Sequence, residues 1–192
     1  MVVNRDGKLW GENTDGKGFL LSLAEEGISP EGKTVMILGA GGAARALAVE
    51  SALAKAEKVI IVNRTMETGE ALTGLVSEKT GVETQFIAWD GRVAVPPEVD
   101  ILINGTSIGL YPHTDQKPEI AYDTIRPDMA VSDVIFNDPN SLFLQEARKQ
   151  GAKTVNGLGM LVNQGALNFK LWTGVDAPVD VMIDVLRREF DL

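Results

Sequence analysis

The hydrophobic positions along the chain follow two patterns in turn, one typical of buried strands and one typical of helices. Short, nearly all-apolar runs predict buried strands; they cover residues 33–39, 58–63, 82–87, 99–104, 129–136 and 153–156. Helical spacing of apolar residues predicts helices; these cover residues 41–56, 66–79, 141–150 and 158–173, with a last helix from residue 178 onward. Strands that alternate with helices indicate an α/β protein with a doubly wound parallel sheet.

The C-terminal half carries clear start and stop signals. Asn140 and Ser141 are residue types that cap helix N-termini, and Gly151 is typical of a helix end. The segment 110–127 contains three prolines, Pro112, Pro118 and Pro127. We expect this segment to be an irregular surface excursion. The last helix is expected to bury one apolar stripe, formed by Val179, Met182, Ile183, Leu186 and Phe190.

Composition narrows the functional classes. The 192 residues carry a net charge of −9, which argues against nucleic acid or an anionic membrane as a partner, because both need clustered Lys and Arg. With 0 Cys there is no disulfide framework and no thiolate chemistry. No signal region opens the chain, and no apolar run approaches the ~20 residues that span a bilayer. We therefore expect a cytoplasmic protein, and no metal site is predicted.

A glycine-rich turn joins the strand 33–39 to the helix 41–56. In I-L-G-A-G-G-A-A-R, Gly39, Gly41 and Ala44 have the spacing G-x-G-x-x-A. In that spacing the first glycine permits a tight turn, the second lets backbone N–H groups approach a pyrophosphate, and the alanine lets the helix pack close to the sheet. The sequence therefore predicts a Rossmann-like dinucleotide-binding loop. Its expected cofactor contacts are Gly39, Ala40, Gly41, Gly42 and Ala43.

The alternative for this turn is a glycine bend before an alanine-rich helix that binds nothing. The strand before the turn, the helix after it and the following strand are all predicted, and this context favours the binding loop. We expect residues 1–192 to form a single dinucleotide-binding domain.

The end of the second strand indicates which dinucleotide binds. An NAD site places Asp or Glu at this tip to hold the ribose hydroxyls. Here the tip reads Asn63, Arg64 and Thr65, 24 positions (63 − 39) after Gly39, with no acid. Arg64 offers a planar guanidinium for a 2′-phosphate, with Asn63 and Thr65 as supporting hydrogen-bond partners. NADP is therefore favoured over NAD, and the alternative is a solvated surface arginine.

Several motifs together resemble those of the shikimate dehydrogenase family. They are GENTDGKGF (11–19), ILGAGGAAR (37–45), VNRT (62–65), ILINGTSIGL (101–110), VSDVIF (131–136) and NGLGMLVNQGALNFKLWTG (156–174). In the family's order they span nearly the whole chain, and they match its C-terminal, NADP-binding part. The resemblance implies an oxidoreductase that reduces 3-dehydroshikimate to shikimate by hydride transfer from NADPH.

The resemblance also implies substrate contacts. Asp15 matches the catalytic acid that lies beside a lysine and touches the substrate; the alternative is an Asp that starts an exposed helix. Gln164 matches a glutamine that binds a substrate hydroxyl, and the alternative is a polar residue on the outer face of a helix. Phe136 stands where a substrate-binding Tyr is usual, so the hydroxyl contact is absent in this chain.

Further cofactor contacts follow from the same resemblance. Thr106 and Ser107 match a turn beside the cofactor, although Gly105 stands where alanine is usual. Val134 and Gly157 match positions whose backbone lies near the nicotinamide. Thr68 stands where the family often has a second basic residue that holds the 2′-phosphate. His113, the only His in the sequence, is expected to be a solvated loop residue.

The family also has an N-terminal substrate domain of about a hundred residues. The resemblance implies that this domain supplies a serine pair, the catalytic lysine and an asparagine, and Lys8, Lys17 and Lys33 match none of these motifs. We expect that domain to be missing here, segments 1–30 and 158–192 to contact it, and the isolated chain to bind cofactor without turnover. Two alternatives remain open: an NAD-linked quinate/shikimate dehydrogenase, and a dinucleotide-binding module without catalysis.

Overall fold

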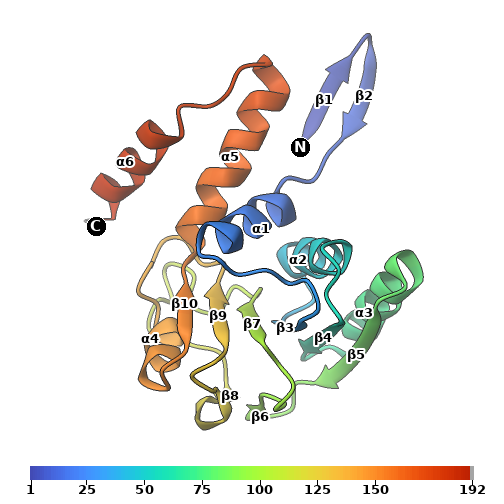
Figure 1. Ribbon diagram of the computed structural model, residues 1–192, viewed down its shortest axis with the longest axis vertical. Coiled ribbons are helices and arrows are strands. Elements are labelled where there is room, and N and C mark those ends of the chain that lie inside the picture. Colours follow the sequence, from blue (N-terminus) through green and yellow to red (C-terminus); the bar gives the residue numbers. More distant parts are fainter. Residues whose placement is uncertain (191–192) are drawn as a thin grey trace.

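The computed structural model describes residues 1–190 (Figure 1). The strands are β1 (Val2–Arg5), β2 (Lys8–Gly11), β3 (Thr34–Leu38), β4 (Lys58–Asn63), β5 (Glu83–Ala88), β6 (Val93–Ala94), β7 (Ile101–Asn104), β8 (Ile120–Ala121), β9 (Ala130–Asp133) and β10 (Lys153–Val155). The helices are α1 (Asp15–Glu25), α2 (Gly42–Leu53), α3 (Met66–Thr80), α4 (Leu142–Lys149), α5 (Gly157–Thr173) and α6 (Val179–Glu189), with a short 3₁₀ turn, η1 (Tyr122–Thr124). None of the helices described combines the length and apolar character needed to cross a bilayer.

The central sheet has six parallel strands in the order β10-β9-β7-β3-β4-β5. The chain enters this sheet in the middle, at β3, and adds β4 and β5 on one side of it. It then crosses to the other side of β3 and adds β7, β9 and β10 there. This confirms the predicted doubly wound Rossmann-like fold. Between β3 and β7 the winding reverses, and ligands of such sheets bind at the carboxyl ends of the strands at this switch point.

Both faces of the inner strands β3, β4 and β7 are buried, and these strands are almost continuously apolar, whereas the edge strand β5 is partly exposed and carries polar residues. Val35 and Ile37 of β3 point into one core, shared with α1, α2, α3 and α5. Met36 and Leu38 point into the other core. That second face is covered by α4 and by the segment between β5 and β9 (Figure 1).

The proline-bearing segment 110–127 corrects the sequence prediction of a surface excursion. Its residues Ile120 and Ile125 are buried in the second core, and β8 pairs with β6. The Tyr122 ring meets the Phe143 ring edge-on, with centroids 6.2 Å apart. The segment lacks helical periodicity, so its role in the core could not be read from the sequence pattern.

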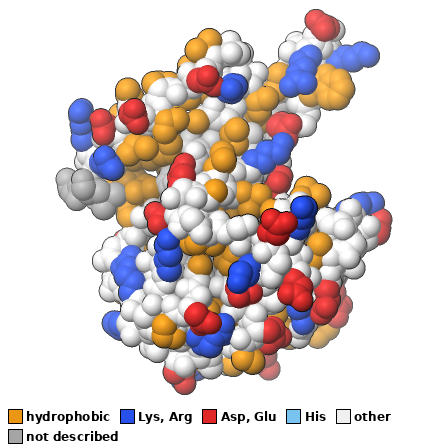
Figure 2. All heavy atoms as spheres, viewed as in Figure 1, with side chains coloured by type: hydrophobic (Ala, Val, Ile, Leu, Met, Phe, Trp, Pro, Cys, Tyr) orange, Lys and Arg blue, Asp and Glu red, His pale blue; other side chains and the backbone are white. Residues whose placement is uncertain are grey.

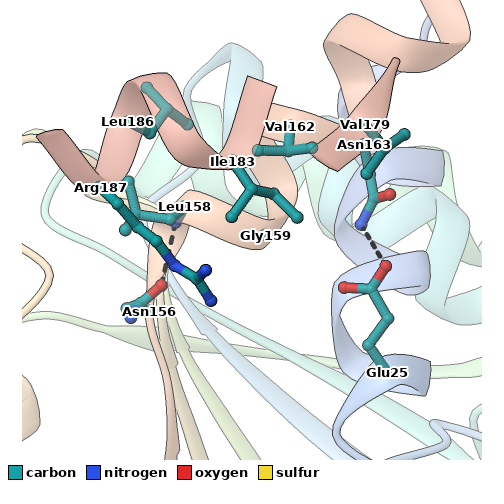
Figure 3. Close-up of a pocket in the computed structure, with 10 residues that line it drawn as sticks. All are labelled: Glu25, Asn156, Leu158, Gly159, Val162, Asn163, Val179, Ile183, Leu186 and Arg187. Atoms are coloured by element: carbon teal, nitrogen blue, oxygen red, sulfur yellow. Dashed lines mark hydrogen bonds between the residues drawn. The ribbon is translucent and has the colours of Figure 1, made fainter. Parts of the chain in front are cut away.

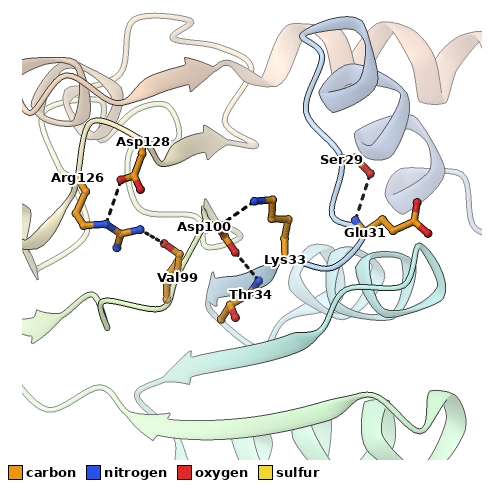
Figure 4. A network of polar contacts seen from close by, with 8 residues as sticks. All are labelled: Ser29, Glu31, Lys33, Thr34, Val99, Asp100, Arg126 and Asp128. Atoms are coloured by element: carbon orange, nitrogen blue, oxygen red, sulfur yellow. Dashed lines mark hydrogen bonds and ion pairs between the residues drawn. The ribbon is translucent and has the colours of Figure 1, made fainter.

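Polar contacts join residues at the amino ends of the central strands (Figure 4). The Asp100 carboxylate, just before β7, accepts hydrogen bonds from the backbone N–H of Thr34 (2.9 Å) and from Lys33 Nζ (3.2 Å). The Arg126 guanidinium donates to the carbonyl of Val99 (3.0 Å). These contacts join the amino ends of β3 and β7, so the carboxyl ends of the two strands keep a fixed relation.

Two glycines dock α1 between α2 and α5. A Cβ at Gly16 would lie 2.6 Å from the carbonyl oxygen of Ala46, and a Cβ at Gly18 would lie 2.6 Å from the backbone nitrogen of Gln164. Phe19 and Leu23 of the same helix are fully buried in the first core. Asp15 is the first residue of α1, as the alternative interpretation expected, but the helix that it starts is not an exposed one.

The hairpin β1–β2 and the helix α6 project on the same side of the sheet as α1 and α5 (Figure 1). The hairpin is linked to α5 by a hydrogen bond from Trp172 Nε1 to the carbonyl of Val2 (3.3 Å). In α6, the predicted stripe is the partly buried side, whereas Val181 and Val185 on another side are exposed.

Candidate functional site

The phosphate loop and the turn after β7 touch each other at the switch point. Gly39 has φ +103°, a conformation that favours glycine. A Cβ there would lie 3.0 Å from Cγ2 of Thr106 and 3.2 Å from the carbonyl oxygen of Gly105. Only glycine therefore lets the chain turn from β3 toward α2 at this place.

The start of α2 has the form of an anion site. Gly41 is its N-cap, in an extended conformation, and Gly42 is its first residue. A Cβ at either glycine would meet no atom within 4 Å beyond its chain neighbours and the backbone of its own helix. Since free N–H groups and the helix dipole favour a negative group here, the chain fits the pyrophosphate of a dinucleotide.

A hollow of about 470 Å³ lies along this edge, and we refer to it as the switch-point cleft. Most predicted cofactor residues line it: Gly39, Ala40, Gly41, Gly42, Ala43, Asn63, Arg64, Thr106, Ser107 and Val134, together with Phe136, which was predicted for the substrate. Thr65, Gly157, Asp15 and Gln164 do not line it. The structure thus brings together the cofactor residues from four strand ends, whereas the two principal substrate residues lie on α1 and α5.

At the tip of β4, Arg64 is the side chain available for a ligand. Asn63 Nδ2 donates to the carbonyl of Thr65 (2.9 Å) and to Thr68 Oγ1 (2.8 Å), and the Thr68 hydroxyl donates to the Thr65 carbonyl (3.0 Å). Arg64 is exposed on the cleft wall, and within residues 1–190 its guanidinium has no hydrogen-bond or ion-pair partner. The neighbouring polar groups brace the turn, and the guanidinium is free to meet a 2′-phosphate.

Asp133, at the end of β9, is a buried carboxylate that the sequence analysis did not single out. Its Oδ1 accepts hydrogen bonds from Asn104 Nδ2 (3.0 Å) and from the N–H of Ile135 (3.1 Å), and its Oδ2 accepts from the Ser141 hydroxyl (2.6 Å). Asn104 Oδ1 in turn accepts from both the N–H and the hydroxyl of Thr106. One buried network therefore holds both loops of the cleft and the N-terminus of α4. The only signal of Asp133 in the sequence is that Ser132 and Asp133 interrupt the otherwise apolar run 129–136.

Burial raises the pKa of Asp133 to about 6, against the lowering effect of its three hydrogen bonds. The nearby Asp138 carboxylate raises the pKa further, and more weakly. The group thus titrates close to neutral pH in the folded chain.

The same network explains why β9 is shorter than the predicted strand 129–136. Val134 donates to the carbonyl of Asn104 (3.3 Å), Ile135 donates to Asp133, and the chain then leaves the sheet along the cleft. Gly157 lies directly behind this turn, because a Cβ there would be 2.5 Å from the carbonyl oxygen of Ile135. The start of α5 is thereby fixed against the cleft wall.

The predicted substrate residues lie where α1 meets α5. Thr14, the N-cap of α1, donates from Oγ1 to Asn168 Oδ1 (2.7 Å), and Gly18 packs on the backbone of Gln164. Asp15 and Gln164 are both partly buried, so neither sits on a fully solvated helix face. Seven residues separate Gln164 from Gly157, which is roughly 10 Å along a helix at 1.5 Å per residue. The end of α1 that carries Asp15 lies farther along α5, because Thr14 meets Asn168, eleven residues and about three helical turns from Gly157.

A separate cavity of about 290 Å³ lies between α1, α5 and α6 (Figure 3). Apolar side chains such as Val162 and Ile183 line it, and Asn163 Nδ2 donates to Glu25 Oε1 (3.1 Å) at one side. None of the predicted site residues lines this cavity. It shares no lining residue with the switch-point cleft and is separate from it.

The fold and the cleft together define the class of protein: a Rossmann-like dinucleotide-binding domain, with a glycine loop at the helix N-terminus and an arginine at the second strand tip. Two family descriptions match the chain: "Shikimate / quinate 5-dehydrogenase" over residues 22–133 and "Shikimate 5'-dehydrogenase C-terminal domain" over residues 157–187. The chain belongs to the shikimate/quinate 5-dehydrogenase family.

Relatives in this family have similar sequences over nearly the whole chain. The NADP(+) shikimate dehydrogenase of Desulforamulus reducens is 44% identical over 191 residues, covering 98% of this chain and 66% of the relative. That of Methanocaldococcus jannaschii is 47% identical over 181 residues, covering 92% of this chain and 62% of the relative. The chain thus spans somewhat less than two thirds of these relatives.

Solved structures agree with this assignment. The ligand-free 5-ketofructose reductase of Gluconobacter sp. strain CHM43 has a TM-score of 0.92 and 46% identity, covering 98% of this chain and 68% of that chain. A shikimate dehydrogenase in complex with NADP+ has a TM-score of 0.86 and 41% identity, covering 98% of this chain and 66% of that chain.

Proposed function

We propose that this chain is the NADP-binding part of a shikimate dehydrogenase, which reduces 3-dehydroshikimate to shikimate. The observation that carries the proposal is the docking of α1 on α5 through Gly18. This contact holds the helix start that bears Asp15 next to the turn that bears Gln164, while the first residue of α5 abuts the cleft wall. A site for substrate hydroxyls beside a dinucleotide cleft is what a hydride transfer between two bound rings requires.

In this proposal the chain's residues bind, orient and handle a proton. The backbone at Gly41 and Gly42 holds the pyrophosphate, Arg64 holds the 2′-phosphate, and Val134 and Gly157 shape the wall beside the nicotinamide. Bound NADPH supplies the hydride for the carbonyl carbon of the substrate. Asp15 holds the hydroxyl proton at its carboxylate together with a lysine from a substrate domain, and Gln164 orients a second hydroxyl.

We further propose that a substrate domain packs against segments 1–30 and 158–192. Large apolar side chains are exposed on these segments. They are Val2, Leu9, Trp10, Leu21, Phe169, Trp172, Val175, Val181 and Val185. Figure 2 shows hydrophobic side chains at the surface over α5, α6 and the hairpin. Exposed apolar surface of this extent marks an interaction site.

The test uses the 192-residue chain by itself and with a substrate domain supplied, fused or in trans. Alone it is expected to bind NADP and to leave shikimate unoxidised, because the proposal assigns the proton partner of Asp15 and the carboxylate contacts to the substrate domain. Acid–base assistance alone is worth about 10²–10⁴ in rate. The supplied domain should restore NADP-dependent oxidation, and Asp15→Asn should abolish the restored activity. Turnover by the lone chain that does not depend on Asp15 would show that the chemistry lies elsewhere.

A second candidate function is the reduction of 5-ketofructose, and two observations favour it. The reductase that acts on this sugar derivative has 46% identity and a TM-score of 0.92 over 98% of the chain. Phe136, 40% exposed on the cleft, also offers no hydroxyl to a shikimate-like substrate. Two chimaeras decide between the candidates, with the N-terminal part taken from the Desulforamulus relative or from the reductase. For each chimaera, kcat/KM for the donor's substrate is divided by the kcat/KM of the intact donor enzyme. The chimaera with the higher ratio identifies the function.

Two other functions are tested by cofactor titration and by supplying a substrate domain. An NAD-linked quinate/shikimate dehydrogenase would bind NAD at least as tightly as NADP. A dinucleotide-binding module without catalysis would stay inactive when a substrate domain is supplied.

A further inference from the structure

The indole ring of Trp89 is held in place at the carboxyl edge of the sheet. Trp89 follows β5 directly, and its backbone N–H donates to the carbonyl of Asn63 at the tip of β4 (3.0 Å). Its Nε1 donates to the carbonyl of Glu119 (3.0 Å), and its ring is half-buried against the second core. Because the Nε1 hydrogen bond and the core contacts hold the ring, and the backbone bond holds the residue at the strand tip, little rotamer entropy remains to be lost when a ligand contacts the indole.

Trp89 stands between two adjoining hollows. One is the switch-point cleft, and the other, of about 510 Å³, continues it toward the segment 110–127. Four residues line both: Arg64, Trp89, Ser107 and Ile108. We refer to the second hollow as the outer hollow. A ligand that enters from the phosphate loop and passes Arg64 therefore meets the indole next.

The order of groups in a dinucleotide matches the order of these elements. The pyrophosphate binds at the start of α2, and the ribose that carries the 2′-phosphate lies at the tip of the second strand. The base attached to that ribose must lie beyond it, toward the next strand, β5. Aromatic side chains at such a place bind bases by stacking, which needs no hydrogen-bond pattern.

We propose that Trp89 is the stacking residue for the adenine of the cofactor, and that the outer hollow is the adenosine end of the site. This inference rests on the proposed function, because it assumes that the chain binds NADP. It names a residue for which the sequence offered no motif.

The charged residues around the outer hollow are consistent with separate roles for Trp89, which would contact the base, and Arg64, which would contact the 2′-phosphate. Lys117 lines it, but its ammonium is engaged by Glu146 (2.9 Å) and lies 4.9 Å from the centre of the Tyr122 ring. Arg64 is thus the cation left for the 2′-phosphate among the Lys and Arg residues that line the hollow. Stacking on the indole should then contribute affinity without contributing to the choice between NADP and NAD.

The experiment measures the affinities of NADP, NAD, 2′,5′-ADP and 5′-AMP for the parent, Trp89→Ala, Trp89→Phe and Arg64→Ala. Trp89→Ala should weaken all four ligands by a similar factor of about five- to hundredfold, the range of a stacking contact. Trp89→Phe should recover most of that loss, since phenyl also stacks. Arg64→Ala should instead lower the preference for the 2′-phosphorylated member of each pair. Trp10→Ala, on the exposed hairpin strand β2, is the matched control and should bind like the parent.

A fluorescence measurement does not depend on how well Trp89→Ala folds. The chain has 3 Trp, and Trp10→Phe combined with Trp172→Phe leaves Trp89 as the sole emitter. Saturating 2′,5′-ADP should change its emission. Unchanged emission, or equal affinities of Trp89→Ala and the parent for 2′,5′-ADP, overturns the inference. A parent that binds neither NADP nor 2′,5′-ADP contradicts the proposed function itself.

Discussion

At the scale of single residues, Gly39 and Gly41 of the glycine turn differ in backbone conformation and in the space around the position of a Cβ. Gly39 has a positive φ and touches the turn after β7, so a side chain there disturbs the fold. Gly41 has an extended backbone, and a Cβ there would meet nothing within 4 Å beyond its neighbours. No steric contact within the described chain therefore requires glycine at position 41.

We predict that Gly41→Val abolishes NADP binding and lowers the free energy of unfolding by only about 1 kcal/mol, the cost of a poorer N-cap residue on α2. The valine side chain would occupy the place of the pyrophosphate but would not press on the chain itself. Titration calorimetry and denaturant unfolding measure the two effects. Gly39→Val is the contrasting variant, and it should lose stability. Normal NADP affinity in Gly41→Val would place the binding site elsewhere.

Arg64 should decide the choice between NADP and NAD. Its guanidinium is exposed on the cleft wall, and the hydroxyl of Thr68 already donates to the Thr65 carbonyl. A single charge-assisted contact of ~1.5–3 kcal/mol corresponds to roughly ten- to hundredfold tighter binding of NADP. Arg64→Ala should reduce this preference to near unity, as measured by calorimetry at fixed salt. An unchanged preference in the variant would rule out this role.

Asp133 should make stability depend on pH between about 4 and 6. Its pKa in the folded chain is about 6 and its ordinary value is 3.8, so the folded chain binds the proton more tightly than the unfolded chain. The stabilisation is then complete below pH 3.8 and is lost as the pH rises through 6, by about 3 kcal/mol at 1.36 kcal/mol per pKa unit.

Asp133→Asn removes this titration, and its amide oxygen can still accept from Asn104 and Ile135. From pH 4 to pH 7, the stability of the variant relative to the parent should therefore increase by about 2 kcal/mol, most of the full effect. Urea unfolding at several pH values measures the difference. A difference that is constant with pH would show that Asp133 does not titrate in this range.

At the scale of elements, the position of α1 depends on glycines that carry no chemistry. In the motif N-T-D-G-K-G, the two glycines let α1 approach the backbones of α2 and α5 more closely than any other residue would. Asp15 and Gln164 are placed by this packing.

We predict that Gly18→Ala destabilises the chain by about 1–3 kcal/mol, the usual cost of overpacking, because the new Cβ would lie 2.6 Å from the backbone nitrogen of Gln164. Gly74→Ala, in α3, is the matched control: a Cβ there meets no atom within 4 Å, and alanine favours the helix by up to ~1 kcal/mol. Thermal and urea unfolding compare the two variants. If both changed stability in the same direction, the close approach of α1 and α5 would be refuted.

At the scale of the whole molecule, a ligand that binds only the folded chain must raise its unfolding temperature. At a concentration one hundred times Kd, NADP should stabilise the chain by ~2.7 kcal/mol. For a protein of this size, 1 kcal/mol corresponds to roughly 2–4 °C, so Tm should rise by about 5–10 °C. Differential scanning calorimetry with and without NADP measures the shift. Gly41→Val should show no shift, and a shift equal to that of the parent would contradict the placement of the pyrophosphate.

The sequence by itself determined the parts of the protein that depend on local rules. The apolar runs of β3 and β4, the glycine turn after β3 and the Ser141 cap of α4 are short patterns whose physical meaning does not depend on distant residues. From them the parallel sheet and most residues of the switch-point cleft could be predicted.

Only the tertiary structure decided the features that join residues distant in the chain. Trp89 meets Glu119, Asp133 meets Asn104, and Gly18 meets Gln164 because the sheet order and helix packing bring these segments together. The same contacts end β9 at Asp133 and bury part of the proline-bearing segment. The spacing of apolar residues within one helix or strand cannot predict these contacts, because each contact depends on how two segments are placed relative to each other.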